Sequence, residues 1–184
     1  MRKLIVTEWM SLDGIFDSTS MDQWFNPYHS ESRAKSIQET IHNCEVMLYG
    51  RTTYEMLFPY WSQLRNNEMG VADKLNKVKK YLVSTTVKQG DWENTTIIKN
   101  DVVKAVDDVK RQGNGNILIQ GSATLVRTLL EAGLVDEFKF VVQPHIMGIQ
   151  TGSFFKGIKN ALELISTQQI EHGVVVLHYK PKFK

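Results

Sequence analysis

One stretch of sequence, Val46–Glu55, indicates the fold most directly and reads VMLYGRTTYE. Its first four residues are apolar and predict a short buried strand. Gly50 then lets the backbone turn, and residues 51–58 predict a helix that Pro59 ends. A strand that runs through a glycine into a helix is typical of an α/β protein with a parallel sheet.

The start of this predicted helix is suited to an anion. Its free N–H groups and the positive end of its dipole favour negative charge. Arg51 adds a permanently charged, planar guanidinium that matches phosphate. Thr52 and Glu55 also fit a capping box, which needs no ligand. Both interpretations stay open at this point.

A second turn of the same kind lies in Ile117–Thr124, which reads ILIQGSAT. Gly121 would let a pyrophosphate approach the backbone, and the hydroxyls of Ser122 and Thr124 would donate hydrogen bonds to it. The alternative is a plain helix start with Ser122 as its cap. Neither turn is a GxGxxG or Walker A motif. Two such turns together predict a ligand beyond the carboxyl ends of the strands.

Strands and helices alternate along the rest of the chain. The other expected strands are Leu4–Trp9, Tyr81–Ser84, Thr95–Ile98, Asn116–Ile119 and Phe138–Val142, with a hairpin of Leu162–Ile170 and Val174–Tyr179. The other expected helices are His29–Asn43, Val71–Lys79, a helix capped by Asn100, and Ala123–Ala132. This order predicts one α/β domain over residues 1–184. It has three layers, α/β/α, in which the central layer is a mostly parallel sheet with a C-terminal antiparallel hairpin.

Composition gives the chain no general affinity for nucleic acid or membranes. The formal net charge is only +2, and the hydrophobic and charged fractions of 42% and 23% are those of a globular protein. The first apolar run, Leu4–Val6, breaks at Glu8, too early for a signal segment or a membrane span. We therefore expect a cytoplasmic protein. Cys44 is the single cysteine and is expected in the core, so no intramolecular disulfide can form.

Several motifs follow one another in a fixed order. They are Ser11–Gly14 (SLDG), Tyr49–Glu55 (YGRTTYE), Lys80–Thr86 (KYLVSTT), Gln120–Leu125 (QGSATL), Gly133–Phe138 (GLVDEF), Pro144–Gly148 (PHIMG), Gly152 and Phe154–Phe155. In this order they resemble the dihydrofolate-reductase superfamily. The most similar branch is the riboflavin-pathway reductase domain, which forms the C-terminal half of bacterial bifunctional deaminase–reductases and also occurs as stand-alone proteins. The resemblance spans nearly the whole chain and implies a dihydrofolate-reductase-like fold.

The resemblance also implies a reduced nicotinamide cofactor, usually NADPH. The turn at Gly50 would hold phosphate, the turn at Gly121 the pyrophosphate, and the end of the strand at Ser84 the adenosine 2′-phosphate. The nicotinamide would lie beside Trp9 and Met10. The expected cofactor-binding residues are Trp9, Met10, Gly50, Arg51, Thr52, Thr53, Ser84, Thr85, Gly121, Ser122, Ala123 and Thr124.

Two positions depart from the pattern of the family. Ser122 stands where the family often has a second glycine, and its Cβ narrows the approach of a pyrophosphate. Thr85 stands where the family often has an arginine, so a cation for the 2′-phosphate is missing. NADPH is expected, and NADH is not excluded.

Candidates for the chemical step and for substrate binding are few. Asp13 ends the first strand beside a glycine-bearing loop and is the best candidate for a proton source or substrate contact, or else an Asx-turn residue. An aromatic wall for a planar substrate would be formed by Trp24, Phe25, Tyr28 and Tyr54, or else these residues are core. Glu8 fits an exposed position on a surface strand as well as it fits a role in the site. The histidines lack the spacing of a metal site, and no metal is expected.

These features predict an NADPH-dependent reductase of a small heterocyclic or carbonyl substrate. The most similar named activity is reduction of 5-amino-6-(5-phosphoribosylamino)uracil, implied by the resemblance alone. A first alternative is a non-catalytic module that binds a nucleotide or another ligand on the same fold. A second is a dihydrofolate reductase, which is disfavoured because Glu31 and Glu39, the acids of the first helix, lack a supporting pattern. A homodimer is expected because this branch commonly pairs.

Overall fold

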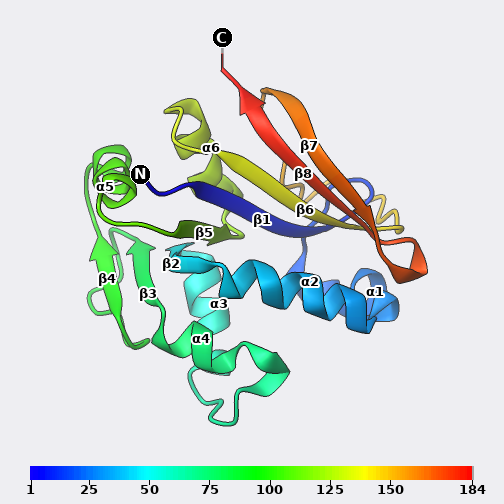
Figure 1. Cartoon of the computed structure of the whole chain (residues 1–184), viewed down its shortest axis with the longest axis horizontal. Coiled ribbons are helices and arrows are strands. Elements are labelled where there is room, and N and C mark those ends of the chain that lie inside the picture. Colours follow the sequence, from blue (N-terminus) through cyan, green and yellow to red (C-terminus); the bar gives the residue numbers. More distant parts are fainter. Residues whose placement is uncertain (184) are drawn as a thin grey trace.

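The apolar runs form one eight-stranded sheet in the computed structural model, which describes residues 1–183 (Figure 1). The strands are β1 (Leu4–Ser11), β2 (Cys44–Gly50), β3 (Lys79–Val83), β4 (Thr95–Ile98), β5 (Asn116–Gln120), β6 (Glu137–Gln143), β7 (Ala161–Gln169) and β8 (Val175–Lys182). Their order is β4-β3-β2-β5-β1-β6-β8-β7. All pairings from β4 to β6 are parallel, and β8 is antiparallel to both β6 and β7. The predicted mostly parallel sheet and C-terminal hairpin are confirmed.

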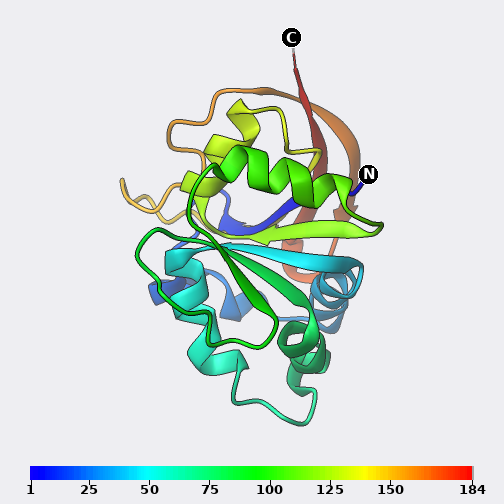
Figure 2. The ribbon, with the colours of Figure 1, turned by 90° about the vertical axis from the view of Figure 1, so that its left-hand side faces the viewer.

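Helices cover both faces of the sheet (Figure 2). They are α1 (Met21–Trp24), α2 (Glu31–His42), α3 (Arg51–Trp61), α4 (Ala72–Lys77), α5 (Val102–Arg111) and α6 (Ala123–Glu131). Side chains of α2, α3 and α4 pack with Met47 and Leu118 in one apolar cluster. Side chains of α5 and α6 pack with Leu4, Val6 and Ile119 in another. Alternate strand residues thus face opposite helix layers, as a period of two requires, and the three-layer prediction is confirmed.

Several helix boundaries differ by one or two residues from the expectation, and two helix ends differ in kind. Pro59 lies inside α3, which runs on to Trp61, and the N–H of Ser62 donates to the Phe58 carbonyl at 3.0 Å. The proline removes one hydrogen bond of the last turn, and the turn still closes around it. Asn100 does not cap α5. The cap position belongs to Asp101, which has a left-handed backbone (φ 47°) and makes no side-chain capping bond.

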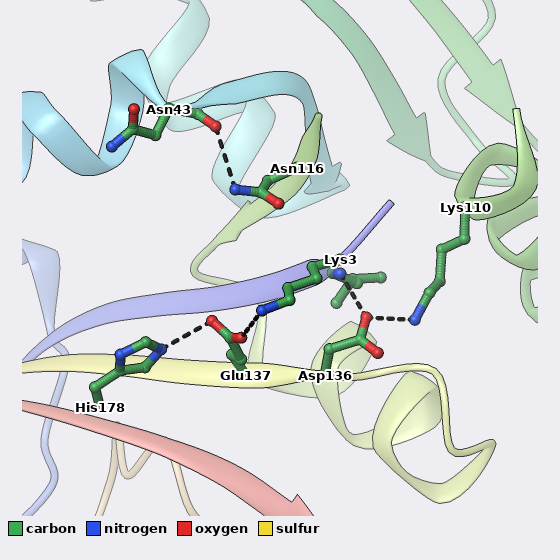
Figure 3. Close-up of polar contacts among 8 residues, drawn as sticks. Lys3, Asn43, Lys110, Asn116, Asp136, Glu137 and His178 are labelled. Atoms are coloured by element: carbon green, nitrogen blue, oxygen red, sulfur yellow. Dashed lines mark hydrogen bonds and ion pairs between the residues drawn. The ribbon is translucent and has the colours of Figure 1, made fainter. Parts of the chain in front are cut away.

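The amino ends of the central strands carry a network of paired charges (Figure 3). Lys110, whose side chain is 4% exposed, donates to the carboxylate of Asp136, which also accepts the N–H of Leu4 at 2.7 Å. Glu137 accepts from Lys3 at 2.7 Å and contacts the His178 ring at 2.9 Å. These contacts join α5, β1, β6 and β8 at the edge of the sheet where the parallel strands begin.

Candidate active site

A cavity of about 160 Å³, open to solvent, lies at the carboxyl ends of β1 and β5 and beside the first turn of α3. This is the edge of a parallel sheet at which α/β proteins bind their ligands. The lining residues are Glu8, Trp9, Phe16, Ser18, Met21, Trp24, Thr52, Thr53, Met56, Leu57, Gln120 and Gly121. Both predicted phosphate turns therefore contribute residues to one cavity.

The two turns touch each other. A Cβ built on Gly50 would clash with the Ser122 hydroxyl oxygen and would lie 2.9 Å from the Ser122 Cβ. Gly121 has φ +72°, and a Cβ there would lie 3.1 Å from the Thr53 Oγ1 and 3.8 Å from the Glu8 Oε2. Glycine is therefore required at both positions, by space at Gly50 and by conformation at Gly121.

The start of α3 has the properties of an anion site. Gly50 occupies the cap position, where it makes no side-chain hydrogen bond, so no side chain at that position satisfies the first N–H groups of the helix. The alternative of a capping box of Thr52 and Glu55 is not formed, because Gly50 is the cap residue and Glu55 pairs with Arg51 at 2.7 Å on the exposed face of the helix. Arg51 is half exposed and lies at the same turn. The residues present fit a phosphate group.

The start of α6 carries backbone strain. Ser122 has φ 66° and ψ 65°, a left-handed conformation that is unfavourable for a residue with a Cβ. Its hydroxyl makes no capping hydrogen bond and lies against Gly50 instead. The capping role considered for Ser122 is therefore wrong. Strain of this kind is often found where a backbone must present a particular shape to a ligand.

Glu8 is the residue that the sequence did not place in the site. Its side chain lines the cavity, and the residue is only 8% exposed. Oε1 accepts the N–H of the adjacent Trp9 at 3.1 Å, whereas Oε2 has no hydrogen-bond partner in residues 1–183. Burial raises the pKa of Glu8 from 4.5 to about 8. The available signal was an acidic residue in the first strand, which is mostly apolar.

Part of the expected aromatic wall is present. Trp24 lines the cavity, and Phe25 stacks at 4.8 Å on Trp9, which also lines it. The buried guanidinium of Arg33 lies 3.9 Å from the Phe25 ring centroid and donates to the Phe25 carbonyl at 2.6 Å. Tyr54 lies elsewhere: its hydroxyl accepts the N–H of Trp92 at 2.7 Å in the core under α3.

Asp13 lies outside the cavity lining. Its carboxylate accepts from the Ser11 hydroxyl at 2.6 Å and from the N–H groups of Met147 and Gly148 at 3.1 and 2.8 Å. Partial burial raises the pKa of Asp13, but these hydrogen bonds outweigh it and leave the pKa below its ordinary value. An ionised carboxylate that joins two loops is poorly suited to supply a proton near neutral pH.

The other expected cofactor residues lie along the same edge of the sheet. Ser84 follows β3, and its hydroxyl accepts the N–H groups of Thr86 and Val87 at 3.2 and 3.1 Å. Thr85 is exposed beside it. Since β3 lies two strands from β5, these residues are about 10 Å to the side of the Gly121 turn. Met10 is buried in the core cluster under α6 and does not line the cavity.

Further structural findings concern metals, membranes and the cysteine. Within residues 1–183, no group of three or more histidine, cysteine or acidic side chains is arranged to hold a metal ion. In the same range no helix combines the length and apolarity that crossing a bilayer requires. Cys44 is buried, as expected, and burial raises the pKa of its thiol to about 11. Cytoplasmic localisation and pairing of two copies stay predictions.

Fold and cavity define the class: this is a dihydrofolate-reductase-like α/β domain with a cavity at the carboxyl edge of the sheet. A solved structure of dihydrofolate reductase from Enterococcus faecalis, complexed with NADP(H), has a TM-score of 0.64 at 12% identity, covering 98% of this chain and 97% of that one. The deaminase/5-amino-6-(5-phosphoribosylamino)uracil reductase of Thermotoga maritima has a TM-score of 0.67 at 12% identity, covering 98% of this chain and 57% of that one.

Residues 2–176 match the RibD C-terminal domain family, so the chain belongs to that family of reductase domains. Among curated proteins, the Bacillus subtilis (strain 168) protein described as Uncharacterized protein YyaP is 28% identical over 148 residues, or 76% of this chain and 75% of that protein. The predicted family branch is therefore confirmed.

Proposed function

We propose that this protein is an NADPH-dependent reductase that transfers a hydride to a small heterocyclic or carbonyl substrate. The observation that carries the proposal is the junction of the Gly50 and Gly121 turns at one cavity. The N–H groups at the start of α3, which no cap side chain satisfies, and the absence of a Cβ on both glycines support a pyrophosphate there. Membership of the RibD C-terminal domain family supports a reductase.

Different groups of residues along the carboxyl edge of the sheet would hold different parts of the cofactor. The turns Gly50–Thr53 and Gly121–Thr124 would hold its phosphates, Ser84 and Thr85 would contact its adenosine end, and Trp9 would lie beside its nicotinamide. The cofactor supplies the hydride, and the protein positions the acceptor and excludes water. Reduction of 5-amino-6-(5-phosphoribosylamino)uracil is the named activity to which the family points.

Cofactor binding is tested by titrating the purified protein with NADPH and with NADH and following tryptophan fluorescence. Arg51→Ala should weaken NADPH binding about tenfold, because a charge-assisted contact to phosphate is lost. Arg111→Ala is the matched control, since Arg111 also forms an exposed ion pair with an acid four residues away, on α5. Thr85→Arg should raise the preference for NADPH over NADH.

The outcomes separate the proposal from its alternatives. If neither nucleotide binds at millimolar concentration, the reductase proposal fails. If NADPH binds and a panel of heterocyclic and carbonyl compounds, including the phosphoribosylaminouracil substrate, never accelerates its oxidation, the protein is a nucleotide-binding module without catalysis. Substrate-dependent oxidation of NADPH supports the proposal.

A further inference from the structure

The cavity contains one ionisable side chain, that of Glu8. No lysine, arginine or histidine of the described residues lines it. The nearby cations are engaged elsewhere, Arg51 with Glu55 at 2.7 Å and Arg33 with the carbonyl of Phe25 at 2.6 Å. The cavity therefore offers an acid and no compensating positive side chain.

The elements around Glu8 present neutral groups to the cavity. These groups are Phe16 and Ser18 after β1, Met21 and Trp24 of α1, Thr52, Thr53, Met56 and Leu57 of α3, and Gln120 and Gly121 at the end of β5. On β6, the strand neighbour of Glu8 is Phe140. With no other charge on the lining, desolvation dominates and raises the pKa of Glu8 to about 8. The acid form therefore predominates at neutral pH, and its hydroxyl needs an acceptor.

We propose that the cavity binds an uncharged, flat and mostly apolar acceptor with one carbonyl or imine group, and that Glu8 donates the proton to its oxygen or nitrogen. The proposal rests on the proposed reductase function and names the substrate class and the acid of that site. It follows from the unpartnered Oε2 of Glu8, the apolar walls and the lack of a cation. A phosphate or carboxylate on the acceptor itself, away from the two turns that would hold the cofactor phosphates, would lose its hydration without gaining a counter-charge from a side chain of the lining.

The proposed step balances as a two-electron reduction. The carbon of the acceptor would form a new C–H bond with a hydride that the reduced nicotinamide dinucleotide would supply, as a C–H bond of its nicotinamide ring breaks. The π electrons of the C=O or C=N bond move to the oxygen or nitrogen, which takes the proton from the Glu8 carboxyl group. The products are the oxidised dinucleotide, an alcohol or amine, and an ionised Glu8, which water protonates again.

The substrate class is tested by ligand binding, independently of turnover. Trp9 and Trp24 line the cavity, so their fluorescence reports occupancy. Benzaldehyde and its carboxylated derivative serve as matched probes in the presence of saturating NADP⁺, which keeps hydride transfer from occurring. The carboxylated probe should bind at least about tenfold more weakly. Met56→Lys, which adds a cation at the half-exposed rim, should remove that difference. Equal binding of both probes to the wild type overturns the proposed substrate class.

The role of Glu8 is tested with Glu8→Gln, which keeps the size and a hydrogen-bond donor but cannot transfer a proton. Turnover should fall about 100-fold with NADPH binding unchanged. Wild-type kcat/KM should decline as pH rises through about 8, and the variant should lose this decline. Infrared difference spectra should show the carbonyl stretch of a protonated carboxyl group in the wild type at neutral pH and not in the variant. Glu45→Gln, an exposed strand glutamate, is the control.

The outcomes distinguish this inference from the proposed function. Turnover that survives in Glu8→Gln, or a missing infrared band in the wild type, overturns the role of Glu8 while leaving cofactor binding intact. Loss of NADPH binding in Glu8→Gln also overturns it, because Glu8 would then act on the cofactor. If the wild type itself binds no dinucleotide, the proposed function fails first, and the infrared band and the probe pair still report on the cavity.

Discussion

The two edges of the sheet treat charge in opposite ways. At the amino edge, Lys110 is paired with Asp136, and Glu137 lies between Lys3 and His178 (Figure 3). At the carboxyl edge, Glu8 is 8% exposed, against 3% for Lys110, and one of its oxygens has no hydrogen-bond partner in residues 1–183. The same strand, β1, connects both edges. Its residue Leu4 donates its N–H to the paired network, while Glu8, four residues on, lines the cavity.

This difference separates stability from function within one sheet. A buried charge with partners is compatible with folding, whereas a buried acid without one costs stability. A natural protein keeps such a cost mostly where a ligand or a reaction uses it. Ser122, with its left-handed backbone, adds a second unfavourable feature at the same edge. We therefore expect mutations at the amino edge to change stability and mutations at the carboxyl edge to change binding and pH dependence.

The largest expected effect is the pH dependence that Glu8 brings to stability. Its pKa rises on folding from 4.5 to about 8, so the folded state holds the proton more tightly. The stabilisation is complete below pH 4.5 and is lost as pH rises through about 8. At 1.36 kcal/mol per pKa unit, its upper limit is about 5 kcal/mol.

Chemical denaturation between these pH values measures this effect. The free energy of unfolding of the wild type should fall with pH relative to that of Glu8→Gln, which has no proton to lose. Glu45→Gln should follow the wild type, because Glu45 is exposed. Parallel curves for the wild type and Glu8→Gln would show that Glu8 titrates normally and would remove the contrast between the two edges.

The amino edge gives the next largest effect. Asp136→Asn removes the charge that balances the buried Lys110. The loss should be about 2 kcal/mol, less than the ~3–5 kcal/mol of a fully buried pair, because the Asp136 side chain is 34% exposed. Denaturant unfolding measures it, and NADPH binding should not change. Asp108→Asn, which breaks an exposed pair with Lys104, should cost less than ~0.5 kcal/mol. Weaker NADPH binding in Asp136→Asn would contradict the separation of the edges.

The sequence predicted the sheet well because apolar runs and glycine turns are local signals. The strand Thr95–Ile98 has the predicted bounds, and the turns at Gly50 and Gly121 follow strands as expected. Local signals failed where distant residues decide. Asp13 looked like a site residue, but its partners Met147 and Gly148 come from a loop far along the chain. Tyr54 was expected in the aromatic wall of the site, but it lies in the core, where its hydroxyl accepts the N–H of Trp92.

The sequence did not identify Glu8 as a cavity residue for the same reason. A single acid in a short strand suits an exposed face, and only the packing of β5, α1 and α3 around it shows that it is enclosed. Whether Oε2 of Glu8 finds a hydrogen-bond partner depends on which side chains the folded structure brings near it, and none of the described residues supplies one. Sequence periodicity assigns residues to faces of a strand and says nothing about what closes the end of the strand.

The smallest expected effect concerns the contact between the two turns. Ser122→Gly relieves the left-handed strain, about 1 kcal/mol, and the greater freedom of glycine in the unfolded chain offsets most of it. The free energy of unfolding should therefore hardly change. NADPH should bind roughly threefold more tightly, because the side chain that lies against Gly50 is gone. Ser122→Ala keeps the Cβ and the strain, so its affinity should stay near that of the wild type.

A double variant sharpens this test. Gly50→Ala alone should weaken NADPH binding, since the new Cβ would lie 2.9 Å from the Cβ of Ser122 and closer still to its hydroxyl. In the Ser122→Gly background both contacts are absent, so the same Gly50→Ala change should cost much less. Additive losses would show that the turns act independently. Weaker binding in both Ser122 variants would instead mean that the hydroxyl donates to the cofactor, and that the strain at this edge positions a ligand group.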